Sequence, residues 1–185
     1  MRRCTRTGLG HGGVTLLLAM CSFATAAHAV SPPSGVVVPV FSIAKSENKN
    51  QVQYVVRLDE HCAPVGAAPV SGYWRMFEEG PLRTAPILPR EARAYGLASQ
   101  TVLVRGVSGG QVRVVLNALS GRPMTIEGSR GSDGGCRALA IVTIAGAPAH
   151  LFNVFVQLKW DGVEYLLLRG WSMDGLRVVT ERLTG

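Results

Sequence analysis

Long apolar runs are missing from this sequence of 185 residues. The longest, Val14 to Ala27, has about 14 residues, whereas a transmembrane helix needs about 20. Two common catalytic signatures are missing too: there is no H-E-x-x-H zinc motif and no phosphate loop with G-K-[ST]. These absences exclude the enzyme classes that carry those motifs. We expect no catalytic residue, no metal site, no cofactor and no transmembrane span in the mature chain.

The N-terminus has the three parts of a secretory signal peptide. Three arginines lie within the first six residues, the apolar segment follows, and Ala27-His28-Ala29 is an A-x-A cleavage site. We therefore expect residues 1–29 to be removed and the mature chain, exported to the periplasm or the medium, to begin at Val30. A lipoprotein is the alternative, because Cys21 lies in the apolar segment, but the bulky Met20 before it does not suit a lipobox.

Charge gives little direct information on partners. Without the signal segment the chain has 16 basic and 12 acidic residues, a net charge of +4. Basic residues scattered along a sequence usually form a solvated surface, although a positive excess also favours anionic envelope components. Nucleic acid is not an expected partner of an exported protein. We expect an envelope or extracellular ligand that the sequence does not identify.

Two cysteines, Cys62 and Cys136, belong to the expected mature chain. An even pair in an oxidising compartment predicts one disulfide. Closing a loop of about 75 residues contributes about 4.5 kcal/mol in the chain-entropy model. The bridge would therefore be structural.

The rest of the chain has the alternation of β-strands. Apolar and polar residues alternate in Gln51–Asp59, in Val112–Ala118 and in Phe152–Trp160, as expected for strands with one buried face. Asp161-Gly162 and Asp174-Gly175 predict hairpins with type I′ turns. The pattern predicts an all-β domain over residues 40–185, after a flexible leader at 30–39. We expect nine to ten strands in a single antiparallel β-barrel or β-sandwich.

Proline interrupts this pattern between Pro81 and Tyr95. Three prolines occur from Pro81 to Pro89, and helix-forming residues then run from Arg90 to Tyr95 before Gly96. A proline before the first turn and a glycine after the last are typical of a short helix. We expect this helix to be the only one in the domain.

Three segments carry a resemblance to a known family. They are Phe41–Asn50, continuing to Tyr54, then Pro69–Met76 with its Tyr73-Trp74 pair, and Ala94-Tyr95-Gly96. In this order they resemble the bacterial family named domain of unknown function 4833, from about Val40 to the C-terminus. Lys45 stands where the family pattern has arginine, which keeps the charge but loses the planar guanidinium. The resemblance implies the extent of the domain and no activity, cofactor or catalytic residue.

Polar and aromatic residues near two of these segments are the candidate ligand-binding residues. They are Lys45, Asn48, Lys49, Asn50, Tyr73 and Arg75. Amide and ammonium groups suit an anionic or sugar-like ligand at a barrel mouth, and aromatic residues beside arginine suit a binding surface. The alternative is structural: asparagine is favoured in hairpin turns, and Trp74 could be a core residue with Tyr73 and Arg75 on the outside.

Two catalytic interpretations stay open as alternatives to a non-catalytic binding module. Ser132–Arg137 is similar to the S-x-G-C-x-R motif of L,D-transpeptidases, which would make Cys136 a cell-wall-acting nucleophile with His61 or His150 as base. One residue between Cys and Arg is missing, and Cys62 is available as a disulfide partner. Glu78-Glu79 could be a pair of glycosidase carboxylates, but adjacent strand residues point to opposite faces.

Overall fold

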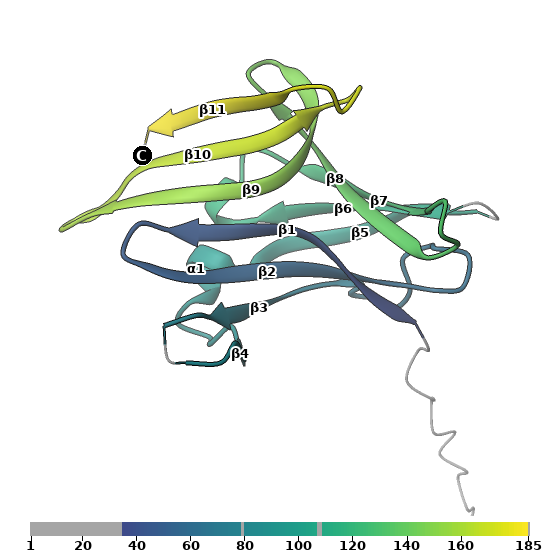
Figure 1. Cartoon of the computed structure of the whole chain (residues 1–185), viewed down its shortest axis with the longest axis horizontal. Coiled ribbons are helices and arrows are strands. Elements are labelled where there is room, and N and C mark those ends of the chain that lie inside the picture. The colour runs from purple at the N-terminus through teal and green to yellow at the C-terminus, as the bar shows by residue number, and fades with distance from the viewer. Residues whose placement is uncertain (1–34, 79, 107–108, 185) are drawn as a thin grey trace, which may run out of the picture. The chain divides into compact units, whose positions relative to one another are not determined.

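A single curved β-sheet forms most of the described part of the protein (Figure 1). The computed structural model describes residues 35–78, 80–106 and 109–184. Its strands are β1 (Val36–Lys45), β2 (Asn48–Leu58), β3 (Val70–Met76), β4 (Arg83–Pro86), β5 (Leu97–Gly106), β6 (Gly109–Leu116), β7 (Met124–Arg130), β8 (Cys136–Ile144), β9 (Ala147–Lys159), β10 (Gly162–Ser172) and β11 (Val178–Thr184). The helix α1 (Ala92–Tyr95) precedes β5, and the 3₁₀ turn η1 (Asn117–Leu119) follows β6. The all-β prediction is confirmed. The signal peptide, the cleavage site after Ala29 and the start of the leader lie outside the described residues.

The long strand β9 joins two arms of the sheet. Along one edge, Ala147–Leu151 pairs with β8 and Asn153–Val156 pairs with β1. The β8-β7-β6-β5 arm and the β1-β2-β3-β4 arm therefore both start at β9, while β10 and β11 extend its other edge. The sheet curls into a half-barrel (Figure 1), and the facing sides of the two arms supply the core.

The sheet departs from the predicted all-antiparallel arrangement at one pair. Strand β1 runs parallel to β9 from Ser42 to Lys45. A parallel pair needs a long connection, and here the chain from β2 to β8 lies between the two strands. Eleven strands are described, more than the nine to ten expected. The additional edge strand β4 lies in the proline-rich segment, where Pro86 is tolerated because an edge strand leaves one side unpaired.

Several boundaries and turns also differ from the prediction. Strand β1 begins at Val36, so the structure has strand where we expected a leader up to Pro39. A type I′ turn needs positive φ at both central residues, and among the described residues only Ala145-Gly146 has it, at 50° and 81°. The predicted type I′ turns are wrong: Trp160-Asp161 forms the β9–β10 turn before Gly162, and Asp174-Gly175 lies in a longer loop.

A bulge changes the predicted core face of β9. Phe152 has no partner on β10: Arg169 lies opposite Asn153, and the next residue, Gly170, lies opposite Leu151. One extra residue moves every later side chain to the other face. Leu151 and Val154 are therefore both buried, whereas Phe152 contacts Trp171 at a ring distance of 5.8 Å, outside the core.

The β2–β3 connection is held to β8 by the predicted disulfide. Cys62 and Cys136 are bonded, with their Cα atoms 5.3 Å apart. Cys62 is fully buried and has a φ of 61°. A Cβ on Gly128 of β7 would overlap the carbonyl oxygen of Cys62, so only glycine permits this close approach.

Candidate functional site

The six predicted ligand-binding residues do not form one site. Val52 and Trp74 lie opposite each other on the core-facing side of β2 and β3, and Lys45 and Asn50 share that side. Gln53 is opposite Tyr73 on the outer side. The predicted residues are thus divided between the two faces of the sheet.

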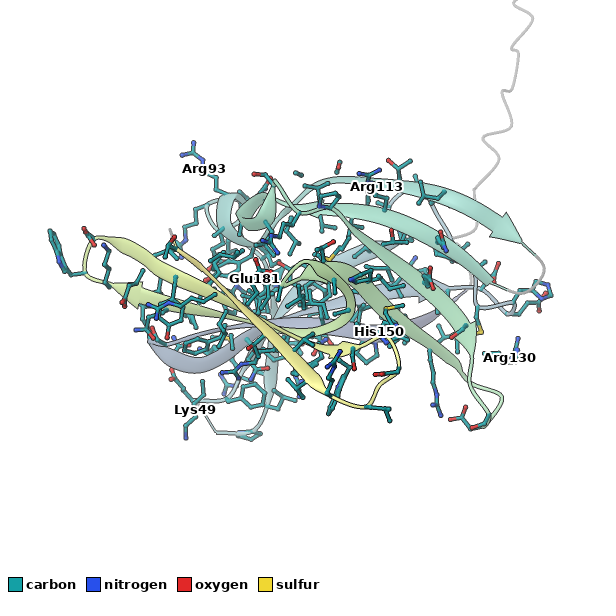
Figure 2. All side chains as sticks on the ribbon, turned by 90° about the horizontal axis from the view of Figure 1, so that it is seen from above. Lys49, Arg93, Arg113, Arg130, His150 and Glu181 are labelled. Carbon is teal, nitrogen blue, oxygen red and sulfur yellow. A yellow bond between two sulfur atoms is a disulfide. The ribbon has the colours of Figure 1, made fainter. Side chains whose placement is uncertain are left out.

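The other four predicted residues, Asn48, Lys49, Tyr73 and Arg75, are partly or fully exposed, and three of them have local partners. The backbone N–H of Lys49 donates to Glu78 Oε1 at 3.0 Å, and the exposed Lys49 side chain projects outward (Figure 2). The Arg75 guanidinium lies 5.1 Å from the Phe77 ring. Asn48 Oδ1 accepts a hydrogen bond from the Asn50 N–H at 3.0 Å, as expected for a turn-forming asparagine. Glu79 lies outside the described residues.

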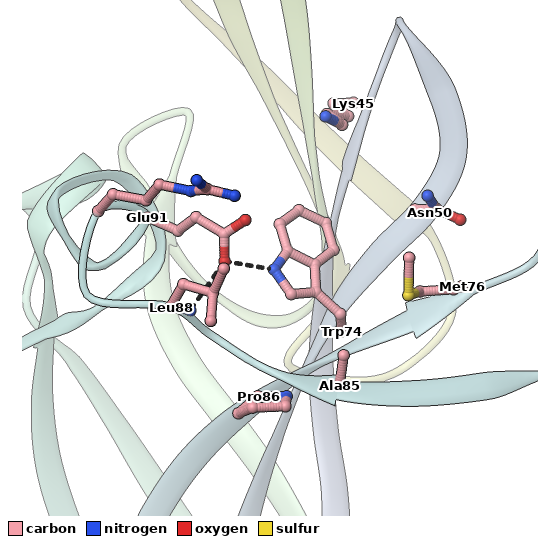
Figure 3. A pocket seen from close by; sticks show the side chains of 9 residues that line it. Lys45, Asn50, Trp74, Met76, Ala85, Pro86, Leu88 and Glu91 are labelled. Carbon is pink, nitrogen blue, oxygen red and sulfur yellow. Dashed lines mark hydrogen bonds between the residues drawn. The ribbon is translucent and has the colours of Figure 1, made fainter.

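Lys45, Asn50, Trp74 and Glu91 line a cavity of about 320 Å³, which we call the Lys45 pocket (Figure 3). The other lining residues are Met76, Ala85, Pro86, Leu88 and Arg90. The Lys45 Nζ lies 5.7 Å from the centroid of the Trp74 ring, within the range of a cation–π contact. Lys45 also pairs with the exposed Glu47 at 3.2 Å.

Glu91 fixes the position of the indole. Its Oε2 atom accepts hydrogen bonds from Trp74 Nε1 at 2.9 Å and from the backbone N–H of Leu88 at 2.8 Å (Figure 3). Both hydrogen bonds lower the pKa of Glu91, and the bond from the Leu88 N–H has the larger effect. The pocket therefore holds a carboxylate at neutral pH, beside an ammonium and an aromatic face.

A chain of aromatic contacts connects the Lys45 pocket to the core. The Trp74 ring meets Tyr95 edge-on with a centroid distance of 5.0 Å. The Tyr54 hydroxyl donates to the carbonyl oxygen of Tyr95 at 2.6 Å, and Tyr54 stacks on Phe41 at 4.5 Å. Burial raises the pKa of Tyr54 far above its ordinary value, so its hydroxyl stays a donor. The three family-like segments therefore meet at this cluster.

Sequence reasoning missed Glu91. It lies just before α1, and the pattern indicated only a short helix there. Its partners Leu88 and Trp74 are 3 and 17 residues away in sequence, and no local motif joins the carboxylate to the indole. Trp74 faces the core as the structural interpretation expected, but it is half-buried and also lines the pocket.

The disulfide includes Cys136, the candidate nucleophile. Because Cys136 is bonded to Cys62, it is not a thiolate in this structure.

Within residues 35–78, 80–106 and 109–184, no three His, Cys, Asp or Glu residues gather as a possible metal site. Among the same residues, no helix has the length and apolar character needed to span a membrane.

Comparison with protein families identifies one over most of the chain. Residues 41–182 match the model described as Domain of unknown function (DUF4833). Comparison with curated proteins and with solved structures gives no match. The matched range contains the three segments that meet at the aromatic cluster beside the Lys45 pocket, and both bonded cysteines. The chain therefore belongs to the DUF4833 family.

Proposed function

We propose that this protein is an exported, non-catalytic binding module whose ligand enters the Lys45 pocket. The observation that carries the proposal is the convergence of an indole, an ammonium, a carboxylate and an amide on one cavity of about 320 Å³. Ligand sites of this kind are concave and mostly apolar, with a few placed polar groups. Of the predicted residues, Lys45 and Asn50 are assigned to the site, and Trp74 and Glu91 are added.

The lining chemistry favours an acidic saccharide of the cell envelope. A pyranose ring has a C–H face that can lie against an indole, and its hydroxyls can donate to a carboxylate and accept from an amide. Lys45 and Arg90 supply two positive charges to the lining and Glu91 supplies its one carboxylate, while the exposed Glu47 pairs with Lys45 from outside the lining. A sugar that carries its own anionic group can replace Glu47 as the partner of Lys45.

Export is part of the proposal. It is supported by the arginine-rich front, the apolar segment and the Ala27-His28-Ala29 site at the N-terminus. A disulfide is also compatible with export, since such bonds persist in oxidising compartments. Mass analysis of protein taken from the periplasm or medium should give Val30 as the first residue. An intact Met1 in cytoplasmic protein would contradict export.

A tryptophan-fluorescence titration tests the site. The chain has three tryptophans, so a Trp160→Phe, Trp171→Phe variant keeps Trp74 as its only indole. The probe is the disaccharide of N-acetylglucosamine and N-acetylmuramic acid, whose lactyl group is an anion. We expect a saturable change in emission, because the sugar ring would replace water at the indole.

Two lysines four residues apart provide a matched pair of variants. Lys45→Ala should weaken binding by a factor of about 10 to 150, since a charged hydrogen bond is worth about 1.5–3 kcal/mol. Lys49→Ala, on the outer face, should leave the affinity unchanged. Equal losses in the two variants would contradict the site assignment. A titration without saturation would contradict a saccharide ligand.

A further inference from the structure

Two adjacent rows of side chains cross the outer face of the sheet, and we call them the outer rows. They follow the strand order β3, β2, β1, β9, β10 and β11, which runs from bottom to top in Figure 1. The register of each strand pair gives the first row as Arg75, Gln51, Ala44, Phe155, Leu167 and Arg182. The second row is Tyr73, Gln53, Ser42, Asn153, Arg169 and Thr180. The residues between the rows on β1, β2 and β9 are Ile43, Val52 and Val154, which are buried, so both rows face away from the core.

Three arginines of the outer rows lie near aromatic rings. A guanidinium whose face rests on a ring keeps the N–H donors at its edge free, and the ring restricts the side chain before any ligand arrives. The distances from Cζ to the ring centroid are 5.1 Å for Arg75 and Phe77, 5.9 Å for Arg169 and Phe155, and 3.8 Å for Arg182 and Tyr165. The edge donors of these guanidinium groups suit the oxygens of an anionic partner.

Positive charge exceeds negative charge on this surface. Its basic side chains are Lys49, Arg75, Arg169 and Arg182. Two carboxylates contact this set: Glu78 accepts the backbone N–H of Lys49, and Glu164 lies 3.7 Å from Arg182. Among the described residues, no carboxylate forms an ion pair with Arg75 or Arg169. Two guanidinium groups are therefore available to an anion.

A groove lies between these two arginines on the outer face. It has a volume of about 430 Å³, and its lining includes Ala44, Phe155 and Phe77. We call it the Ala44 groove, because the small side chain of Ala44 leaves space in the middle of the first row. Arg75 lies by the Phe77 ring and Arg169 by the Phe155 ring, so the two arginines flank the groove.

The spacing of the arginines favours an extended ligand. Arg75 is on β3 and Arg169 is on β10, four strands away in the sheet. Neighbouring strands are about 4.8 Å apart, so about 19 Å of surface separates the two backbones. One small anion cannot contact both side chains at their bases. A single exposed ionic contact contributes little to affinity, whereas several contacts made by one molecule reinforce each other.

We propose that the outer rows bind an extended anionic polysaccharide, which crosses the strands from Arg75 to Arg169 and passes over the Ala44 groove. Between the two arginines the rows present neutral amides and a hydroxyl, which suit the hydroxyl groups of sugars. The rows run across the strands, whereas an extended peptide binds along a sheet edge as an added strand. This surface is separate from the Lys45 pocket, and the inference does not rest on the proposed function.

Isothermal titration calorimetry with oligogalacturonates, linear chains with one carboxylate on each sugar, tests the proposal. The decamer should bind saturably, and the dimer should bind at least about tenfold more weakly because it cannot reach both arginines. Arg75→Gln and Arg169→Gln should each weaken decamer binding about fivefold, as expected for an exposed charge. The double variant should weaken it about 25-fold, because positions this far apart act independently.

Arg113→Gln is the matched control. Arg113 is an exposed arginine on β6, and it lies on the opposite side of the molecule from Lys49 (Figure 2). The control should bind the decamer as tightly as the wild type. A loss equal to that of Arg75→Gln would show that only net charge matters and would overturn the proposal.

Further outcomes separate this surface from other ligands and from the Lys45 pocket. Equal decamer affinities in wild type and the double variant would overturn the proposal, as would equal affinities for dimer and decamer. Polyglutamate binding more tightly than the decamer would overturn the saccharide assignment. Binding to phosphatidylglycerol vesicles without binding to the decamer would overturn it in favour of a membrane surface. The double variant should keep the Trp74 response to the disaccharide, and loss of that response would contradict two separate sites.

Discussion

Replacing Cys62 and Cys136 by alanine should cost this protein a large part of its stability. The bond joins positions 74 residues apart, and in the chain-entropy model a loop of about this length stabilises the folded state by about 4.5 kcal/mol. Whole domains are stable by about 5–15 kcal/mol. In a domain of about 150 residues, each kcal/mol corresponds to about 2–4 °C, so the melting temperature should fall by roughly 9–18 °C.

Guanidinium denaturation and calorimetry without reductant measure this loss. Cys62 is fully buried, so alanine also leaves a small void, and dithiothreitol on the wild type isolates the effect of the covalent link. The reductant should lower the stability of the wild type and leave the double alanine variant unchanged. A loss below about 1 kcal/mol in both experiments would refute the argument that the bridge restricts the unfolded chain.

Three further predictions concern close contacts. Gly128→Ala should destabilise the fold by about 1–3 kcal/mol, because its methyl group would overlap the Cys62 carbonyl oxygen; an unchanged denaturation midpoint would contradict that packing. Ala145→Gly should raise the melting temperature slightly and Ala145→Val should lower it, because φ is 50° and a left-handed backbone costs a non-glycine residue about 1–2 kcal/mol. Glu181 accepts two hydrogen bonds from Arg122, at 2.5 and 2.6 Å, and one from the Ala145 N–H, and the Arg122 bonds are the main cause of its lowered pKa. A lowered folded-state pKa stabilises the protein above the ordinary value of 4.5, and this stability is lost as pH falls through the folded pKa. Glu181→Gln should therefore lower the free energy of unfolding by about 1 kcal/mol at neutral pH and reduce the further loss of stability on acidification. If stability depends on pH in the variant as it does in the wild type, the Arg122–Glu181 contact does not contribute in this way.

Local patterns predicted local structure well. Alternation located β2 and β9, and the proline and glycine around Arg90–Tyr95 indicated a short helix where α1 occurs. The disulfide was inferred from the even number of cysteines in the expected mature chain and from the oxidising compartment that export implies. Each of these inferences depends on neighbours in sequence or on a single pair of residues, which a sequence displays directly.

The missed features depend on long-range pairing. No local signal indicates that Ser42–Lys45 lies parallel to Asn153–Val156, because the partner of a strand is chosen by the packing of the whole domain. The bulge at Phe152 is also invisible in the alternation, and it reversed the predicted face of that residue. Glu91 belongs to the Lys45 pocket only because the proline-rich segment carries it to Trp74.

The indole resonance of Trp74 gives the most direct test of the Lys45 pocket. Three indole N–H signals are expected from the uniformly ¹⁵N-labelled protein, and a Trp74→Phe variant assigns one of them. On titration with the disaccharide, the Trp74 signal should shift progressively and saturate, because its N–H donates to Glu91 inside the pocket. The signals of Trp160 and Trp171 should stay in place. A saturable shift of either of those two without one at Trp74 would contradict the account.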